Sequence, residues 1–381
     1  MSRVIDEHRL YLRDRARVSA YARALAEVVR PGDVVVDLAS GTGILGMLAC
    51  RAGAARVYAI EGDTIAGLAR SIARANGLAD RIVGVRGHSM HVSLPERADL
   101  LVSDQIGRFG LEAEIIDLFR DARARLLRPN ARLVPSTIRL IVAPIEDASL
   151  HRRVTFWRHR PAGFDFSPAA TIAANTGYPA RFRPEQLLAS PNQAGLVDLA
   201  ADVPLPIRCV ATFSTTRDGV LHGVGGWFEA QLSPSVTLTN SPLSDDRIYR
   251  RQIFFPLAEG VPIVVGDSIT VAIRMLPSQL IYVWEVGVRP STGPARRFRH
   301  STLEGMLLAP EDLRCTDPNR RPRLTPRGVA RSTVLSLCDG HRTVREIEDG
   351  VLERHPELCA TRDDAATFVA EVLTRYATDG V

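Results

Sequence analysis

A short glycine-rich segment, Asp37-Leu-Ala-Ser-Gly41-Thr-Gly43, lies between an apolar run and a stretch with helical spacing. Glycine lets the backbone turn tightly and lets a ligand come close to it, so such a segment favours a binding turn between a strand and a helix. Glu61 ends the next apolar run. Because a carboxylate at that place can accept hydrogen bonds from both hydroxyls of a ribose, the pattern predicts a nucleoside-binding site.

The residues around the glycines distinguish two kinds of cofactor. In dinucleotide-binding turns the third glycine of G-x-G-x-x-G opens the helix, whereas this segment continues Gly-Thr-Gly-Ile-Leu-Gly and has Asp37 ahead of it. That arrangement is typical of methyltransferases, and we predict S-adenosylmethionine as the cofactor. A nicotinamide or flavin cofactor and a purely structural turn are the alternatives.

Three carboxylates that follow the run Leu-Leu-Val-Ser form a second group of candidates. Asp104 comes directly after that run, and Glu112 and Glu114 lie a little further on. Substrates of open α/β sheets bind at the carboxyl ends of strands, so these carboxylates could hold a cationic acceptor and accept a proton from an amine. We predict all three as catalytic. The alternatives are a polar strand end for Asp104 and a solvated helix start for the glutamates. No spacing of cysteines predicts a metal site.

The elements that position these residues alternate between strand and helix. Four apolar runs are separated by stretches with helical spacing, at 34–38, 57–61, 82–87 and 100–104. This is the rhythm of a parallel, doubly wound sheet. Residues 6–29 carry apolar side chains at helical spacing and predict one or two helices over the mouth of that sheet. We therefore predict a Rossmann-like α/β domain over residues 1–134.

The sequence then changes to short runs rich in Val, Ile, Thr and aromatic residues, between about residues 135 and 308. Such runs, separated by Gly, Pro, Asp and Ser, favour an antiparallel barrel or sandwich. We predict a β-barrel substrate domain here. Residues 167–196 lack the alternation of a strand, and we interpret them as an inserted arm.

Several segments between residues 8 and 305 resemble the protein arginine methyltransferase family. HRLYLRDRAR is similar to the family's leading helix, and VVVDLASGTGILGMLACRAGAARVYAIE to its central motif, while RFRPEQLLASP resembles its dimerisation arm. The resemblance implies a homodimer, and it implies that Arg17 pairs with the methionine carboxylate of the cofactor beneath a lid that includes Asp14. The cofactor-binding residues that it implies are His8, Tyr11, Arg17, Asp37, Ala39, Gly41, Gly43, Glu61, Ser89 and Met90.

The departures from that family concern the acceptor. The family's hairpin carries two glutamates that grip a guanidinium, whereas here Asp104 stands at the first place and Ala113 at the second. Ile248-Tyr249-Arg250 takes the place of the family's Thr-His-Trp loop. Ala39 replaces a usual glycine, and Met90 stands where the family has an adenine-binding glutamate. Because of these changes, arginine methylation cannot be carried over from the family, and they are what is expected if the fold has accepted a different nucleophile.

A proline- and arginine-rich stretch at 311–324 predicts a linker, and a third domain is expected over residues 317–381. In it, Thr343 and Glu346 form a capping box ahead of an apolar helix face, and a second helix is expected at about 363–376. This segment is similar to small winged-helix domains of the PqqD type. The resemblance implies binding of a leader peptide by β-augmentation, in which the peptide adds a strand to a sheet edge. The alternative is an unspecialised helical tail.

Together these features predict an N-methyltransferase that acts on an amine or guanidinium nitrogen of a ribosomally made precursor peptide, with the leader bound by the last domain. One alternative is an arginine N-methyltransferase that acts on proteins or free arginine. Another is an inactive, cofactor-binding interaction subunit.

The composition excludes several other classes of protein. All 48 basic residues are arginine and none is lysine, which rules out Schiff-base chemistry and a Walker-type phosphate lysine. The net charge is +5, but the arginines are scattered among 43 acidic residues, so no nucleic-acid partner is expected. The N-terminus lacks the apolar run of a signal peptide, and no membrane association is predicted. The five cysteines are an odd number, and we expect a reduced, cytoplasmic setting.

Overall fold

The computed structural model describes residues 3–63, 65–306 and 320–378. The parallel sheet and the antiparallel strands that follow it belong to one compact unit, and the helices beyond residue 320 belong to a second. No helix in the described ranges is long and apolar enough to cross a membrane.

The first half of the larger unit is a five-stranded sheet in the order β3-β2-β1-β4-β5, and every neighbouring pair is parallel. Its strands are β1 (Val34–Leu38), β2 (Arg56–Glu61), β3 (Ile82–Arg86), β4 (Ala98–Ser103) and β5 (Leu127–Val134). All five residues of β1 are buried, as expected for a central strand covered on both faces. The strand order reverses between β1 and β4. The carboxyl ends of these two strands therefore flank the crevice in which open α/β sheets bind ligands.

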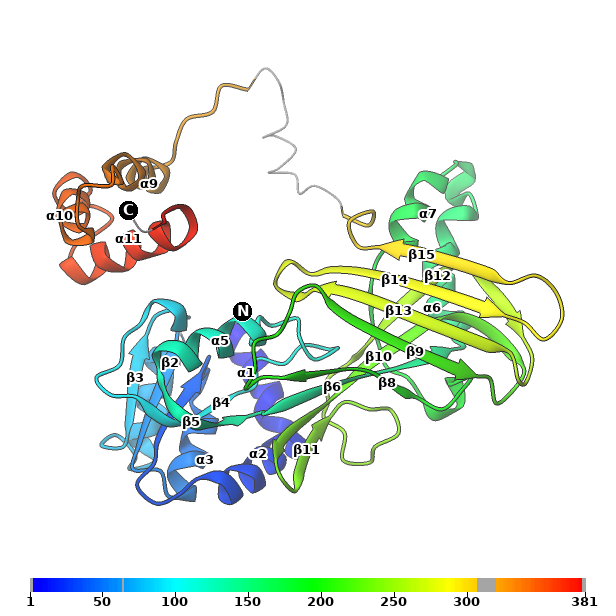
Figure 1. Ribbon diagram of the computed structural model, residues 1–381, viewed down its shortest axis with the longest axis horizontal. Helices are drawn as coiled ribbons and strands as arrows, with labels where there is room; N and C mark the ends of the chain where they lie inside the picture. The colour runs from blue at the N-terminus through cyan, green and yellow to red at the C-terminus, as the bar shows by residue number, and fades with distance from the viewer. Residues whose placement is uncertain (1–2, 64, 307–319, 379–381) are drawn as a thin grey trace. The chain divides into compact units, whose positions relative to one another are not determined.

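Helices cover both faces of this sheet, with α2 and α3 on one face and α5 on the other (Figure 1). Their bounds are α1 (Arg3–Arg13), α2 (Arg15–Val28), α3 (Ile44–Ala52), α4 (Ala66–Ala75) and α5 (Ile115–Arg125). Asp14 separates the two leading helices and caps α2, since its side chain accepts from the amide of Arg17. Tyr21 and Leu25 lie one helical turn apart on α2 and are fully buried. The leading helices are thus anchored by α2, while α1 exposes much of its surface.

The second half of the larger unit consists of two antiparallel sheets. One has the order β7-β12-β10-β6-β8, with β11 paired to β10, and the other has the order β15-β14-β13-β9. The strands are β6 (Thr137–Ile145), β7 (Tyr178–Ala180), β8 (Asn192–Asp198), β9 (Ile207–Ser214), β10 (Gly219–Ser233), β11 (Val236–Thr239), β12 (Gln252–Ile263), β13 (Ser268–Leu276), β14 (Ile281–Arg289) and β15 (Arg296–Ser301).

Aromatic side chains join the two antiparallel sheets. Phe255 on β12 and Trp284 on β14 lie with ring centroids 5.3 Å apart, and both are fully buried. The indole nitrogen of Trp284 donates to the carbonyl of Pro256, so the buried donor has a partner. In β9, buried and exposed residues alternate along the whole strand. This is the pattern of a strand with one face on a core and one face in solvent.

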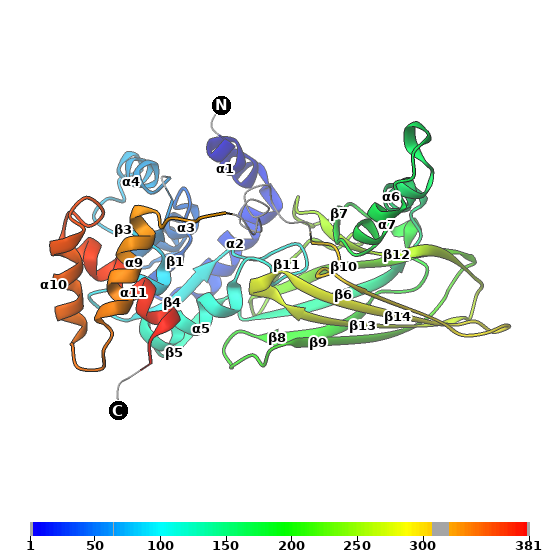
Figure 2. The same cartoon turned by 90° about the horizontal axis from the view of Figure 1, so that it is seen from above.

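The interpretation of residues 167–196 as an arm without strands is wrong in part. The structure places β7 and most of β8 in this range, together with α7 (Ser167–Ala174). α7 packs with α6 (Ala148–Thr155) against β12, and Figure 2 shows the helix pair on one side of the strands. The sequence concealed β7 because it has only three residues, one of which is Pro179. Proline is tolerated there because β7 is an edge strand.

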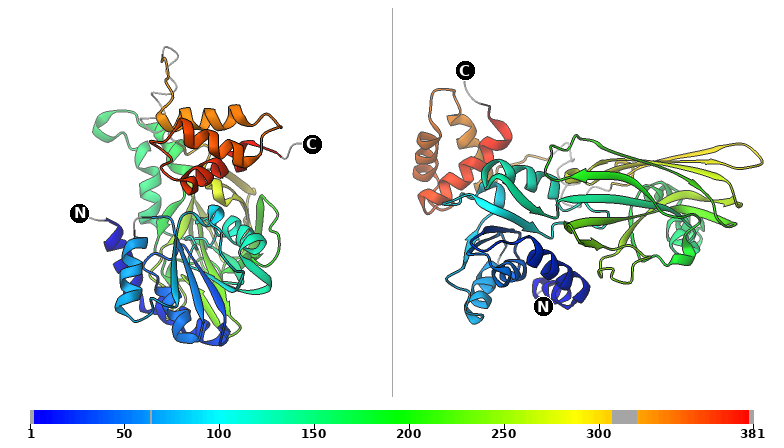
Figure 3. Two further views of the ribbon diagram at one scale, coloured as in Figure 1. Left: turned by 90° about the vertical axis from the view of Figure 1, so that its left-hand side faces the viewer. Right: turned by 60° about the horizontal axis from the view of Figure 1, so that its bottom comes forward.

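The smaller unit contains three helices among its described residues, α9 (Pro326–Leu337), α10 (Val344–Arg354) and α11 (Arg362–Tyr376) (Figure 3). The capping box of Thr343 and Glu346 opens α10, as predicted, and Val334, Val351 and Val369 are buried in the core of the unit. The predicted winged helix is not confirmed, because residues 320–378 contain no strand. The connections between these helices are short and lack the alternating β-branched residues of a wing. Residues 311–319 of the predicted linker lie outside the described residues.

Candidate active site

The glycine-rich turn lies between β1 and α3 and depends on left-handed backbone angles. Gly41 and Gly43 have φ values of 55° and 79°. A Cβ on Gly41 would lie 2.6 Å from Cε1 of His8, so the lid residue His8 can approach the turn only because glycine is present. Ala39 has a φ of 53°, which is strained for a residue with a side chain. This backbone angle is the physical reason for the glycine that the family usually has at this position.

Glu61 at the end of β2 lies between two cavities. It lines a cavity of about 770 Å³ beneath the lid and a smaller one of about 190 Å³ on the other side. Its carboxylate accepts from the amide of Gly41 at 2.7 Å and from the amide of Asp63 at 2.9 Å. Each carboxylate oxygen has a second lone pair, so Glu61 can still accept two donors from a ligand.

The smaller cavity has a mixed lining. Apolar side chains of Leu38, Ile60 and Leu118 line it together with polar residues such as Ser89. Apolar side chains with a few polar groups suit an aromatic ring that carries hydrogen-bonding atoms. Because Glu61 lines both cavities, it connects this space to the larger cavity.

Two of the predicted cofactor residues, Asp37 and Met90, line neither of these two cavities. Asp37 is completely buried under the turn, where its carboxylate accepts from the amide of Gly46 at 2.8 Å, and it lines neither of the two cavities. Burial raises the pKa of Asp37 to about 7. Its role is to hold the turn against α3. Met90 also lines neither cavity, whereas its neighbour Ser89 does.

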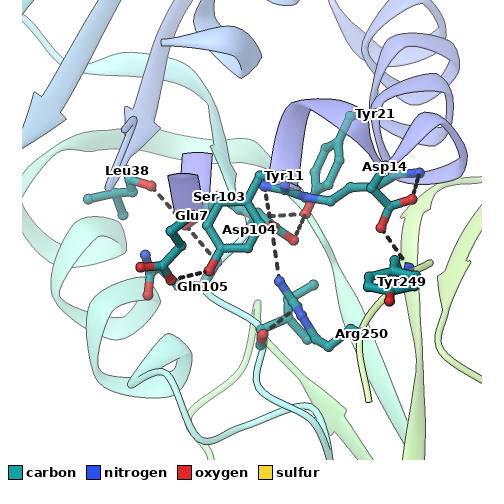
Figure 4. Close-up of polar contacts among 12 residues, drawn as sticks. Glu7, Tyr11, Asp14, Tyr21, Leu38, Ser103, Asp104, Gln105, Tyr249 and Arg250 are labelled. Atoms are coloured by element: carbon teal, nitrogen blue, oxygen red, sulfur yellow. Dashed lines mark hydrogen bonds and ion pairs between the residues drawn. The ribbon is translucent and has the colours of Figure 1, made fainter. Parts of the chain in front are cut away.

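Asp104 at the end of β4 is the centre of a buried polar cluster (Figure 4). One carboxylate oxygen forms an ion pair with Nη2 of Arg17 at 2.5 Å and accepts from Nη2 of Arg250 at 3.1 Å. The other accepts from the hydroxyl of Tyr21 at 3.2 Å. The side chain of Asp104 is only 9% exposed, so these contacts act in a largely desolvated site. Asp104 therefore already binds two guanidinium groups of its own chain.

The lid helices complete the wall of the larger cavity. The guanidinium of Arg17 lies 4.5 Å from the ring centroid of Tyr11, and the Tyr11 hydroxyl donates to Glu7. Asp14 accepts from the amide of Tyr249, which ties the lid to the loop after β11. His8, Tyr11, Arg17 and Asp104 all line this cavity. The structure thus brings the predicted lid residues and the predicted catalytic Asp104 to one space.

The three residues at the end of the hairpin have different surroundings. Glu112 folds back, and its carboxylate accepts from the amides of Phe109 and Leu111 at 2.9 and 3.1 Å. Burial raises the pKa of Glu112. Ala113 lines both cavities, so the methyl group stands where the family has its second glutamate. Glu114 is exposed, has a φ of 60° and lines only the smaller cavity. Of the three predicted carboxylates, only Asp104 combines a place in the cavity with guanidinium partners.

Two residues of this cluster, Tyr21 and Arg250, were not among the predicted site residues. Tyr21 lies four residues after Arg17, on the same face of α2, and this helical spacing was the signal that could have revealed it. The hydroxyl of Tyr21 also donates to the carbonyl of Ser103, and burial followed by the charge of Asp104 raises its pKa well above the usual value. Arg250 is far from Asp104 in the sequence, and nothing local predicts the contact.

Unsatisfied polar atoms allow a test of the predicted cofactor. Nε of Arg17 and Oγ of Ser40 are buried and have no hydrogen-bond partner among the described residues. Both residues line the larger cavity, which is also lined by Gly41 and Glu61. A cofactor with a carboxylate, a ribose and an adenine needs a cationic donor, a ribose acceptor and an apolar slot in this order. The residues present supply all three, so they fit S-adenosylmethionine.

Known families match the two halves of the larger unit. Residues 137–282 match the family described as arginine methyltransferase oligomerization subdomain. Residues 20–140 match the family described as ribosomal protein L11 methyltransferase (PrmA). Both matches end before the helices of the smaller unit, so the resemblance of that unit to PqqD-type domains is not shown.

Curated relatives extend over both halves. The chain is 30% identical over 279 residues to the arginine N(omega)-methyltransferase of Streptomyces achromogenes subsp. streptozoticus, which covers 70% of this chain and 75% of that protein. It is 29% identical over 288 residues to the probable histone-arginine methyltransferase 1.4 of Arabidopsis thaliana. That alignment covers 70% of this chain and 53% of the relative, so the chain spans about half the length of such relatives.

Solved structures have the same fold. The PRMT1 enzyme-prozyme complex of Trypanosoma brucei, described as heterotetrameric and with AdoHcy, matches with a TM-score of 0.69 and 22% identity, covering 77% of this chain and 97% of that chain. Protein arginine methyltransferase 10 of Arabidopsis thaliana matches with a TM-score of 0.67 and 24% identity, covering 76% and 95%.

The parallel sheet, the glycine turn and the β-rich half define an S-adenosylmethionine-dependent methyltransferase with a Rossmann-like domain and a barrel-like domain. The predicted cofactor is confirmed. The chain belongs to the arginine methyltransferase family, as its similarity to the Streptomyces enzyme shows. Residues 137–282 correspond to the part of that family whose description names oligomerization.

Proposed function

We propose that this protein transfers the methyl group of S-adenosylmethionine to a guanidinium nitrogen of arginine, either free or in a polypeptide. The observation that carries the proposal is the carboxylate of Asp104, which lies at the cofactor cavity and accepts from two guanidinium groups. A carboxylate that binds Arg17 and Arg250 has the geometry to bind the guanidinium of an acceptor. The relatives with arginine methyltransferase in their names support the same acceptor.

In this proposal each part of the cofactor has a residue to hold it. Arg17, whose Nε has no other partner, binds the carboxylate of the methionine part, and Glu61 accepts from the ribose. The adenine lies in the smaller cavity beside Ile60 and Ser89. The bound cofactor supplies an electrophilic methyl group, and the protein holds the acceptor nitrogen in line with it at roughly 3 to 3.5 Å.

The acceptor guanidinium takes the place that Arg250 has at Asp104. Its N–H groups donate to the carboxylate, which turns the nitrogen lone pair toward the methyl group. As the N–C bond would form, the bond between the methyl carbon and the sulfur would break and leave the neutral thioether of S-adenosylhomocysteine. The acceptor nitrogen would then lose one proton, and Asp104 is the carboxylate within reach of it. Ala113 leaves this site with one carboxylate where the family has two, so Asp104 carries both the binding and the orientation.

A second candidate is N-methylation of an amine in a ribosomally made precursor peptide. It is favoured by Arg250, which occupies Asp104, and by Ala113, because both changes weaken a site for a guanidinium. A neutral amine needs less negative charge than a guanidinium. In this version the helices α9 to α11 bind the leader of the peptide. Because residues 320–378 contain no strand, such binding would use a helix surface and not β-augmentation.

We further propose that the protein is a homodimer, formed through its matched oligomerization subdomain. Light scattering coupled to size-exclusion chromatography measures this directly. A mass of one chain at micromolar concentration would contradict it.

The acceptor is tested with purified full-length protein and S-adenosylmethionine that carries a labelled methyl group. Free arginine, an arginine peptide and a peptide with a primary amine are offered in parallel, and the products are measured by mass spectrometry. Methylation of arginine at a nitrogen supports the main proposal, and methylation of the amine alone supports the second candidate. Tight binding of S-adenosylhomocysteine without transfer to any acceptor would contradict both and favour an inactive subunit.

A further inference from the structure

A group of arginines surrounds the entrance to the larger cavity, where the lid helices approach the barrel. Two cavities of about 530 and 390 Å³ adjoin there and share Arg181, Arg247 and Ile248. We call them the arginine funnel. Its walls also contain Arg13 and Arg15 from the lid. Ile248 and Arg181 line the larger cavity too, so the funnel leads into the space that contains Asp104.

Four arginines of the funnel have no carboxylate partner among the described residues, whereas Arg250, which also lines it, is paired with Asp104. In the described part of the chain, Arg13, Arg15, Arg181 and Arg247 form no ion pair. Arg181 instead lies over the ring of Tyr249, with its guanidinium carbon 3.7 Å from the ring centroid. A stacked guanidinium keeps its N–H groups available for an anion.

The two carboxylates in the walls of the funnel are already bound elsewhere. Asp14 caps α2 and accepts from the amide of Tyr249 at 2.7 Å. Asp147 caps α6 and accepts from the amide of Leu150 at 2.9 Å and from the side chain of Gln186 at 2.6 Å. Both carboxylates are used to hold helix starts. The funnel therefore has an excess of positive charge that its own walls do not balance.

We propose that the arginine funnel binds carboxylates of the acceptor, and that the acceptor is a polypeptide with acidic residues next to the modified nitrogen. The planar guanidinium group matches a carboxylate with two parallel hydrogen bonds. The volumes of the two cavities are in the range that holds a few side chains. This inference rests on the proposed function, because the funnel leads to the acceptor site.

Charge elsewhere on the surface favours a peptide over a nucleic acid. A nucleic-acid backbone needs a continuous basic track. Outside the funnel, many exposed arginines are paired with carboxylates, for example Arg9 with Asp6 and Arg120 with Asp117. Unpaired arginines also lie elsewhere among the described residues, for example Arg208 and Arg289, but the funnel gathers four of them in the wall of one cavity, which suits a short acidic segment.

The test measures binding of two labelled peptides by fluorescence anisotropy, with S-adenosylhomocysteine present. One peptide has a central arginine with two glutamates on each side, and its twin has glutamine at these four positions. We expect the wild-type chain to bind the glutamate peptide at least tenfold more tightly at low salt. The preference should fall to less than threefold in Arg181→Gln/Arg247→Gln, because two unbalanced charges have been removed.

A matched control removes two charges from the same unit without touching the funnel. Arg208 and Arg289 are exposed on β9 and β14 and form no ion pair in the described ranges, so Arg208→Gln/Arg289→Gln should keep the full preference. Arg13→Gln/Arg15→Gln is a second funnel variant, altered in the lid and not in the barrel. It should lose the preference as well. Thermal unfolding monitored by circular dichroism verifies that each variant is folded.

Three results would overturn the inference: equal binding of the two peptides by the wild-type chain, an equal loss of preference in the control variant, or stronger competition by a single-stranded oligonucleotide of the same charge. Measuring methylation of the same peptides distinguishes a failure of this inference from a failure of the proposed function. A preference for the glutamate peptide without methylation of any peptide contradicts the function alone. Methylation with no preference contradicts the funnel alone.

Discussion

Substitution of Arg250 by methionine tests whether an arginine of the chain competes with the acceptor for Asp104. Arg250 reaches Asp104 from the loop before β12, and the two side chains are 17% and 9% exposed. Methionine has a similar length and no charge, so it fills the space without binding the carboxylate. Asp104 keeps Arg17 and Tyr21 as partners and is not left as an isolated buried charge.

The expected change in the KM for the acceptor follows from the contact between Arg250 and Asp104, which an acceptor must displace. A hydrogen bond between charged groups contributes about 1.5–3 kcal/mol, and each 1.4 kcal/mol corresponds to a factor of ten in affinity. Arg250→Met should therefore lower the KM for free arginine or an arginine peptide by about 10-fold to 100-fold. The kcat should change little, because the position of the bound acceptor relative to the methyl group stays the same. Arg250 also donates to the carbonyl of Ile106, so its loss costs some stability.

The assay is initial-rate methyl transfer with labelled S-adenosylmethionine over a range of acceptor concentrations. Arg251→Met is the matched control, since Arg251 lines the same cavity and forms no ion pair in the described part of the chain. The control should keep the wild-type KM. An unchanged or raised KM in Arg250→Met, with binding of S-adenosylhomocysteine intact, would refute the competition. It would mean that Arg250 helps to bind the acceptor.

Three further predictions concern the cofactor side of the site. Glu61→Gln removes the charged acceptor of the ribose, and calorimetry should show about 10-fold to 100-fold weaker binding of S-adenosylhomocysteine; an unchanged Kd would contradict that role. Ala39→Gly relieves a φ of 53° but makes the unfolded chain more flexible, and chemical denaturation should show a free energy of unfolding that is roughly 0.5–1 kcal/mol higher. A lower free energy of unfolding would mean that the methyl group of Ala39 contributes to packing. Burial raises the pKa of Asp37 to about 7, above its ordinary 3.8, so the folded protein binds a proton that the unfolded chain releases. The stability that this proton contributes should be complete below about pH 4 and lost as the pH rises through 7, and Asp37→Asn should flatten the fall in the free energy of unfolding between about pH 4 and pH 7.

The parallel sheet and the glycine turn could be predicted because their signals are local. The run Val34–Leu38, the glycines after it and Glu61 at the next strand end are close in sequence, and hydrophobic periodicity reveals the elements that hold them. The edge strand β7 was concealed because it is three residues long. The sequence placed Asp37 at the turn but could not show that its side chain is buried beneath the turn, because a residue below a turn and one above it have the same local pattern.

The acceptor site was predictable only in part, for a related reason. Asp104 stood at a strand end, where position alone indicates a role. Its partner Arg250 lies 146 residues away and its partner Tyr21 lies 83 residues away. The contact of Arg250 depends on how the β-rich half packs against the parallel sheet, and no local pattern encodes it, whereas the helical spacing of Tyr21 from Arg17 on α2 gave a partial signal. The arginines of the funnel are also far apart in the sequence, from Arg13 to Arg247. The sequence therefore does not show that their charges lie close together.

The most direct test of the proposed function compares turnover and cofactor binding in Asp104→Asn. Asparagine keeps the size of the side chain and loses the charge that binds the acceptor and receives its proton. The account predicts that methyl transfer to arginine falls by at least about 100-fold, while the Kd for S-adenosylhomocysteine stays within a few-fold of the wild type. Methyl transfer at the wild-type rate in Asp104→Asn would contradict the assignment of Asp104 as the residue that holds the acceptor.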